Sequence, residues 1–102
     1  PVEKIHAPVL LLSAGDDKVW PSRAMSERVM ARLDAHHFRY RHLHYTYDGA
    51  GHICCAGDPA QPWPSGTGSG GLQLGGTADA NKSARADAWA KTLRFLDETL
   101  QH

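Results

Sequence analysis

Two short stretches of the chain contain side chains suited to acid–base chemistry. Asp16 and Asp17 come shortly after the apolar run Val9–Leu12, and His52 ends the glycine-punctuated stretch 48–52. A carboxylate can accept a hydrogen bond from imidazole Nδ1, which fixes the tautomer and leaves Nε2 free as a general base. Histidine suits this role because it ordinarily gains and loses its proton near neutral pH. These residue types indicate a carboxylate–imidazole pair, provided that the fold brings them together.

The same residues also have ordinary structural interpretations. Aspartates after a strand often form turns or cap helices. A histidine in a glycine-rich loop is often a plain surface residue. Gly49 and Gly51 would let the backbone turn sharply beside His52 and bring it close to a reacting group. Spacing alone leaves both interpretations open.

The order of elements predicts how these groups are positioned. The continuous apolar run Val9–Leu12 is typical of a buried strand in a parallel sheet. Alternation at 41–46 predicts a second strand. Ser22 is expected to cap the first helix. The predicted order is strand, helix, strand, long loop and helix, at residues 9–12, 22–35, 41–46, 57–76 and 77–100.

Apolar spacing predicts which face of each helix is buried. The expected buried stripes are Met25, Val29, Met30 and Leu33 in the first helix, and Trp89, Leu93, Leu96 and Leu100, with Phe95 beside them, in the last. His36 and His37 are expected to close the first helix, where an imidazolium favours the negative end of the dipole.

The expected fold class is α/β, with two parallel strands and flanking helices in a single segment 1–102. Because parallel strands end at the same edge of a sheet, Asp16, Asp17 and His52 should meet there. Two strands make a poor sheet alone, so the edges should be paired by upstream sequence or by another copy of the chain. A start at Pro1 is interpreted as a piece of a longer protein.

Composition excludes several function classes. The 102 residues contain 11 Lys and Arg against 11 Asp and Glu, and this balance argues against a nucleic-acid partner. No apolar run approaches the length of a membrane span. The only two cysteines, Cys54 and Cys55, are adjacent, which is unsuited to a disulfide framework and indicates free thiols in a reducing cytoplasm.

Metal and loop sites are alternatives of less weight. His42 and His44 share a strand face and, with His52, could bind zinc, but no cysteine or acidic partner has matching spacing. Neither a metal nor a cofactor is therefore expected. The Gly/Pro-rich loop 57–76 within the segment, with Trp63, could cover a bound ligand or form a disordered excursion.

Several of these stretches together resemble one family. Residues 8–17, followed by Trp20-Pro21-Ser22, look like the acid-bearing strand and turn of α/β-hydrolases. More narrowly, they look like the C-terminal domain of acyl-CoA thioesterases and bile-acid-CoA:amino-acid N-acyltransferases. Residues 47–52 are similar to the loop that bears their histidine. Gly75-Gly76-Thr77 and Asp87-Ala88-Trp89 resemble the opening of their final helix.

The resemblance implies acyl transfer from a coenzyme A thioester to water or to an amino acid. It implies Asp17 as the acid and His52 as the base of a triad whose order is nucleophile, acid, histidine. Asp16 would then help to shape the turn. The nucleophile and the oxyanion hole are expected upstream.

The chain also departs from the family pattern. No Gly-x-Ser-x-Gly or Gly-x-Cys-x-Gly elbow occurs in it, and residues 53–56 replace an expected proline-rich sequence. Ser69, Cys54 and Cys55 all follow His52, against the required order. The segment alone is therefore expected to be inactive. A dienelactone-hydrolase-like or peptidase-like esterase, or a non-catalytic module whose sheet edge recruits a strand, are the alternatives.

Overall fold

The computed structural model describes residues 1–61, 68–69 and 72–100 of the chain. Its elements are a 3₁₀ turn η1 (Val2–Lys4), β1 (Val9–Ala14), α1 (Ser22–Ala35), β2 (His42–Tyr47), β3 (Gly68–Ser69), β4 (Leu72–Gln73) and α2 (Ala78–Leu100). The predicted order of the main elements is thus observed. Residues 62–67 and 70–71 of the predicted loop 57–76, including Trp63, lie outside the described residues. The short β3–β4 pair was not predicted.

The two long strands form a parallel pair. Register runs from Val9 opposite His42 to Ala14 opposite Tyr47, so both strands end at the same edge. The amide N of Gly15 then donates to the carbonyl of Tyr47 at 2.9 Å, which extends the pairing by one step. This sheet and its helices make a mixed α/β fold, as expected.

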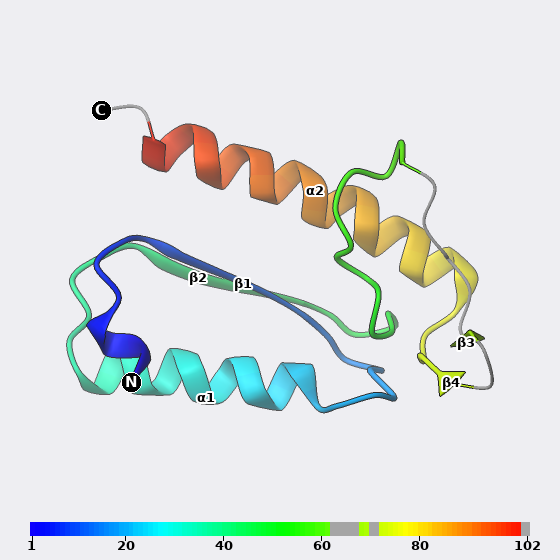
Figure 1. Ribbon diagram of the computed structural model, residues 1–102, viewed down its shortest axis with the longest axis horizontal. Coiled ribbons are helices and arrows are strands. Elements are labelled where there is room, and N and C mark those ends of the chain that lie inside the picture. Colours follow the sequence, from blue (N-terminus) through cyan, green and yellow to red (C-terminus); the bar gives the residue numbers. More distant parts are fainter. Residues whose placement is uncertain (62–67, 70–71, 101–102) are drawn as a thin grey trace.

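Helices cover both faces of the sheet, α1 on one side and α2 on the other (Figure 1). Leu33 of α1 is fully buried against the sheet. On the α2 side the core is built from small residues, namely Ala14, Ala50, Cys54 and Ala84. Because these side chains are short, the first turns of α2 approach the ends of the strands closely.

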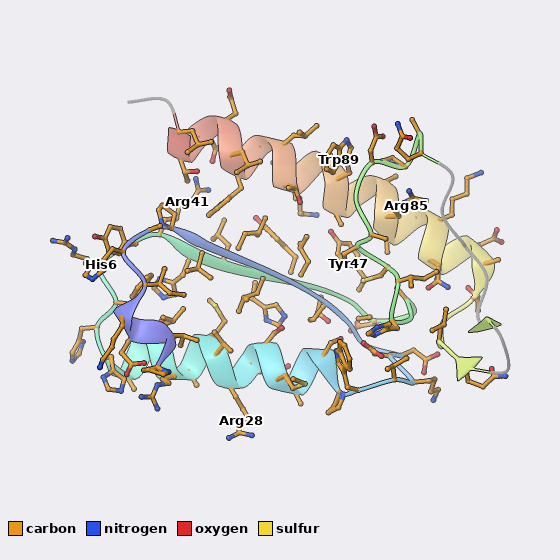
Figure 2. All side chains as sticks on the ribbon, viewed as in Figure 1. His6, Arg28, Arg41, Tyr47, Arg85 and Trp89 are labelled. Carbon is orange, nitrogen blue, oxygen red and sulfur yellow. The ribbon has the colours of Figure 1, made fainter. Side chains whose placement is uncertain are left out.

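The buried face of α2 differs from the predicted stripe. Ala84, Ala88 and Phe95 are buried, whereas Leu93, Leu96 and Leu100 are exposed at 49%, 44% and 74%. Tyr47, which lies between the sheet and the helix, donates its hydroxyl to Asp87 at 2.6 Å (Figure 2). Contacts of the alanine face and of Tyr47 decide the rotation of the helix, and they leave the leucines on its outer surface.

The start of α1 also corrects a prediction. Pro21 is the residue that precedes the helix, and the helix has no side-chain cap. Ser22 instead accepts a hydrogen bond from the amide N of Ala14 at 3.1 Å and lies 3.3 Å from the Ala14 carbonyl. Its hydroxyl therefore joins the helix to the end of β1.

The apolar run of β1 is less buried than expected. Residues 9–12 are only half-buried, because β1 pairs with β2 alone among the described strands and its other edge is open.

Candidate active site

Asp17 and His52 lie in contact at the carboxyl-terminal edge of the sheet. Oδ2 of Asp17 is 3.2 Å from Nδ1 of His52. The Asp17 side chain is only 3% exposed, and that of His52 is 25% exposed. With the proton on Nδ1, the imidazole donates to the carboxylate and keeps Nε2 as an acceptor. A carboxylate in this position can orient an imidazole that acts as a general base.

The turn after β1 holds the Asp17 carboxylate in place. Oδ1 accepts hydrogen bonds from the amide N of Val19 at 2.9 Å and of Trp20 at 3.2 Å. Burial alone would raise the pKa of Asp17, but these two donors, with His52 and Ser22, outweigh it and lower that pKa. Asp17 therefore stays ionised at neutral pH.

Asp16 has a different role. Its Oδ2 accepts from the amide N of Gly76 at 2.8 Å, and its Oδ1 forms an ion pair with Lys18 at 3.1 Å. The Gly76 hydrogen bond is the main cause of a lowered pKa for Asp16. Of the two adjacent acids, Asp17 contacts His52, while Asp16 accepts a hydrogen bond from the turn before α2.

Backbone hydrogen bonds anchor the histidine loop. The amide N of His52 donates to the carbonyl of Leu74 at 2.8 Å, and that carbonyl also accepts from Lys18 at 3.3 Å. An isolated antiparallel bridge joins Ala50 to Gly76. Reasoning from the sequence did not place residues 74–76 at the site; the paired glycines were the available signal.

Two glycines are required by close backbone approach. A Cβ on Gly51 would lie 2.2 Å from the Gly75 carbonyl oxygen, and one on Gly75 would lie 1.9 Å from that of Asp16. Gly75 also has a φ of 88°. A Cβ on Gly49 would meet only an ordinary contact, with Ala80 at 3.5 Å, so the expected need for glycine holds at Gly51 and is not supported at Gly49.

A hollow of about 340 Å³ lies beside the acid–base pair. It is lined by Leu12, Ser13, Ala14, Asp17, Trp20, Ser22, His52 and residues 53–56. The rings of Trp20 and His52 meet edge to face, with centroids 4.4 Å apart. Trp20 therefore forms a wall beside the imidazole, and the two free cysteines line the same hollow.

The remaining strand histidines have separate partners. His42 Nε2 is 2.8 Å from an Asp34 oxygen, and its Nδ1 is 2.8 Å from the Tyr40 carbonyl. His44 Nε2 is 2.7 Å from the hydroxyl of Ser13. Within the described part of the chain, no group of three or more potential ligands is arranged to hold a metal ion.

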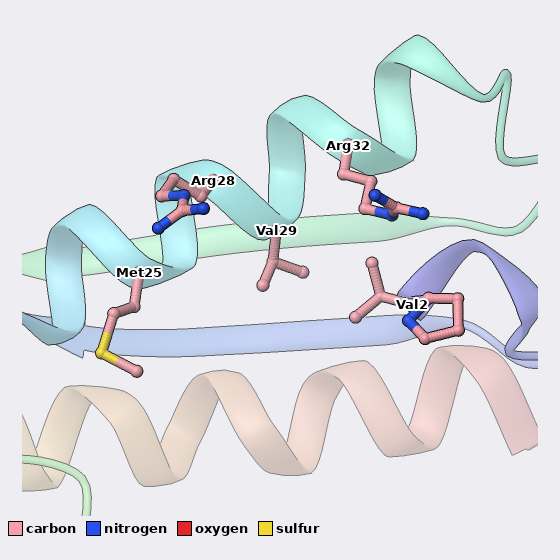
Figure 3. Close-up of a pocket in the computed structure, with 6 residues that line it drawn as sticks. Val2, Met25, Arg28, Val29 and Arg32 are labelled. Carbon is pink, nitrogen blue, oxygen red and sulfur yellow. The ribbon is translucent and has the colours of Figure 1, made fainter.

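A larger hollow, of about 670 Å³, lies elsewhere, between the N-terminus and α1. In Figure 3, Met25 and Val29 reach from α1 toward the strands, with Val2 opposite. Arg32 on its rim is already paired with Glu3 at 2.6 Å. None of its lining residues belongs to the acid–base pair.

Comparison with known proteins shows the family of the chain. A scan of protein families matches residues 1–102 to the family described as BAAT / acyl-CoA thioester hydrolase C terminal. The chain belongs to this family. Membership implies, in general terms, an acyl-CoA thioester hydrolase or acyltransferase type of function. Comparison with curated proteins found no match.

Among the described helices, none has both the length and the apolar character needed to cross a membrane.

The close approach at Gly75 leads to a stability prediction. Gly75→Ala should cost about 3 kcal/mol, because the new methyl group must displace the Asp16 backbone as well as adopt a positive φ. Gly57 is the matched control, since its φ is 92° and a Cβ there meets nothing within 4 Å. Gly57→Ala should cost about 1 kcal/mol. Urea unfolding measures both, and equal losses would contradict the close approach.

The lowered pKa of Asp17 leads to a prediction of acid stability. As the pH falls, the unfolded chain binds a proton at this carboxyl near pH 4, whereas the folded chain binds it only at a lower pH. The stabilisation is therefore complete above about pH 4 and is lost as pH falls through the lower folded value. Asp17→Asn should show a shallower loss of unfolding free energy between pH 5 and 2 than the wild type. Parallel curves for Asp17→Asn and wild type would contradict the assignment.

Proposed function

We propose that this chain supplies the acid and the base of an acyl-CoA thioester hydrolase or an acyl-CoA:amino-acid N-acyltransferase. The observation that carries the proposal is the 3.2 Å contact between buried Asp17 and partly exposed His52 beside a hollow. Family membership supplies the substrate class, an acyl thioester of coenzyme A.

The proposed reaction uses His52 as a proton shuttle. Nε2 takes the proton of a serine hydroxyl or cysteine thiol as that group attacks the thioester carbonyl. The resulting imidazolium is stabilised by the Asp17 carboxylate. His52 then protonates the departing thiolate of coenzyme A. In the second half, it activates water or an amine to release the acyl group.

The nucleophile is proposed to come from a segment outside these 102 residues. The sequence contains no nucleophile elbow, and Cys54 and Cys55 lie too close in sequence to the base to form one. Such an elbow presents its side chain on a strained strand-to-helix turn and also provides part of the oxyanion hole.

Uncovered surfaces of the chain support the proposal that it is part of a larger domain. The open edge of β1, the hollow lined by Met25 and Val29, and the exposed leucines of α2 all lack cover among the described residues. A strand added to β1 would pair its free backbone groups. A second copy of this chain could cover the same surfaces, but it would bring no elbow.

The proposal predicts the effect of removing either partner of the pair. In a protein that joins this chain to its nucleophile-bearing segment, Asp17→Ala and His52→Ala should each lower kcat for acyl-CoA at least about 100-fold. Coenzyme A release with a thiol-trapping reagent measures the rate. The 102 residues alone should release thiol no faster than buffer.

A second histidine–aspartate pair provides the matched control. His42 and Asp34 are in contact at 2.8 Å on another part of the molecule, so His42→Ala should leave kcat unchanged. Unchanged rates for Asp17→Ala and His52→Ala would favour a non-catalytic module. Faster turnover of simple esters than of acyl-CoA would favour another α/β-hydrolase, and product formation that depends on added glycine would identify the acyltransferase.

A further inference from the structure

Asn81 is a buried polar residue that the proposed reaction does not use directly. It lies in the first turn of α2 and is only 2% exposed. Its Oδ1 accepts a hydrogen bond from the amide N of Gly51 at 2.7 Å, and its Nδ2 donates to the Gly75 carbonyl at 3.4 Å. Burial of an amide is unfavourable unless both ends find partners, and here both ends do.

The two partners of Asn81 are the neighbours of the groups that anchor His52. Gly51 directly precedes His52, and Gly75 directly follows Leu74, whose carbonyl accepts from the His52 amide at 2.8 Å. The Asn81 amide thus closes a ring of hydrogen bonds around the histidine backbone. Asp16 holds the same turn from the other side through Gly76.

We propose that Asn81 is a positioning residue for His52, fixing the loop through Gly51 and Gly75 so that imidazole Nδ1 faces Asp17. This inference rests on the proposed function for its kinetic consequence, but its structural consequence does not depend on that function. Gly51 is itself buried, so without Asn81 Oδ1 its amide would lose its partner, and the loop would shift to regain one.

Kinetics of the complete enzyme provide the first test. Asn81→Ala should lower kcat for acyl-CoA about 10- to 100-fold with little change in KM, because a displaced base slows chemistry without changing substrate contacts. Leu33→Ala is the stability control: Leu33 is fully buried between α1 and the sheet, away from the pair. It should lose at least as much stability yet keep its kcat.

The ring of His52 provides a second test that needs no substrate. Nitrogen NMR of the imidazole in the same protein should show the Nδ1–H tautomer in wild type and in Leu33→Ala. Asn81→Ala should shift these signals toward a mixture of tautomers. Suppose that Asn81→Ala changes the ring signals, while Asp17→Ala and His52→Ala keep the wild-type kcat. The positioning role would then stand, and the proposed function would be overturned.

Asn81→Asp keeps the acceptor for Gly51 and loses the donor to Gly75. Its kcat should lie between those of wild type and Asn81→Ala, about three- to tenfold below wild type. If Asn81→Ala does not fold, Asn81→Asp decides in its place. Wild-type kcat and wild-type ring signals in the tested variant, or equal losses of kcat in Asn81→Ala and Leu33→Ala, would overturn the positioning role.

Discussion

Parallel pairing of β1 with β2 is the constraint on which the candidate site depends. The register that sets Ala14 opposite Tyr47 sends the chain out of both strands at one edge. Asp17 follows three residues beyond the first strand, and His52 follows five beyond the second. A slip of one residue would reverse the faces of one strand and move its loop by about 3.3 Å, enough to break the contact between carboxylate and imidazole.

Backbone hydrogen bonds provide most of the contacts that hold this edge of the sheet together. One carbonyl, that of Leu74, accepts from the loop of the base and from the turn of the acid. Each such hydrogen bond stabilises the fold by about 1 kcal/mol. Because the hydrogen bonds share the Leu74 carbonyl, the two loops and the turn before α2 form one unit. Side chains also join that unit: Asp16 and Asn81 bind its backbone, and Asp17 contacts His52 across it.

Local patterns in the sequence predicted the elements, and long-range contacts account for what they missed. The apolar run of β1, the alternation of β2 and the two helical stretches were all readable because each depends on neighbours in the sequence. Adjacent Asp16 and Asp17 were not separable by spacing; only the family resemblance favoured Asp17.

Contacts across the fold decided the remaining details. Gly76 and Asp16 are 60 residues apart, and Asn81 and Gly51 are 30 apart, so no local period reports either contact. The α2 stripe was misassigned for a related reason. Leucine spacing identifies an apolar face, but short alanines determined which side of the helix could approach the sheet.

Under the proposed function, proton transfer and contact with the acyl group would fall to separate residues, because main-chain hydrogen bonds provide most of the contacts that anchor the His52 loop. Ile53 and Ala56 border the hollow without taking part in the ring of hydrogen bonds that anchors the base. Under the same proposal, exchange of these two wall side chains would change the room for a longer, shorter or bulkier acyl tail and leave Asp17 and His52 in place.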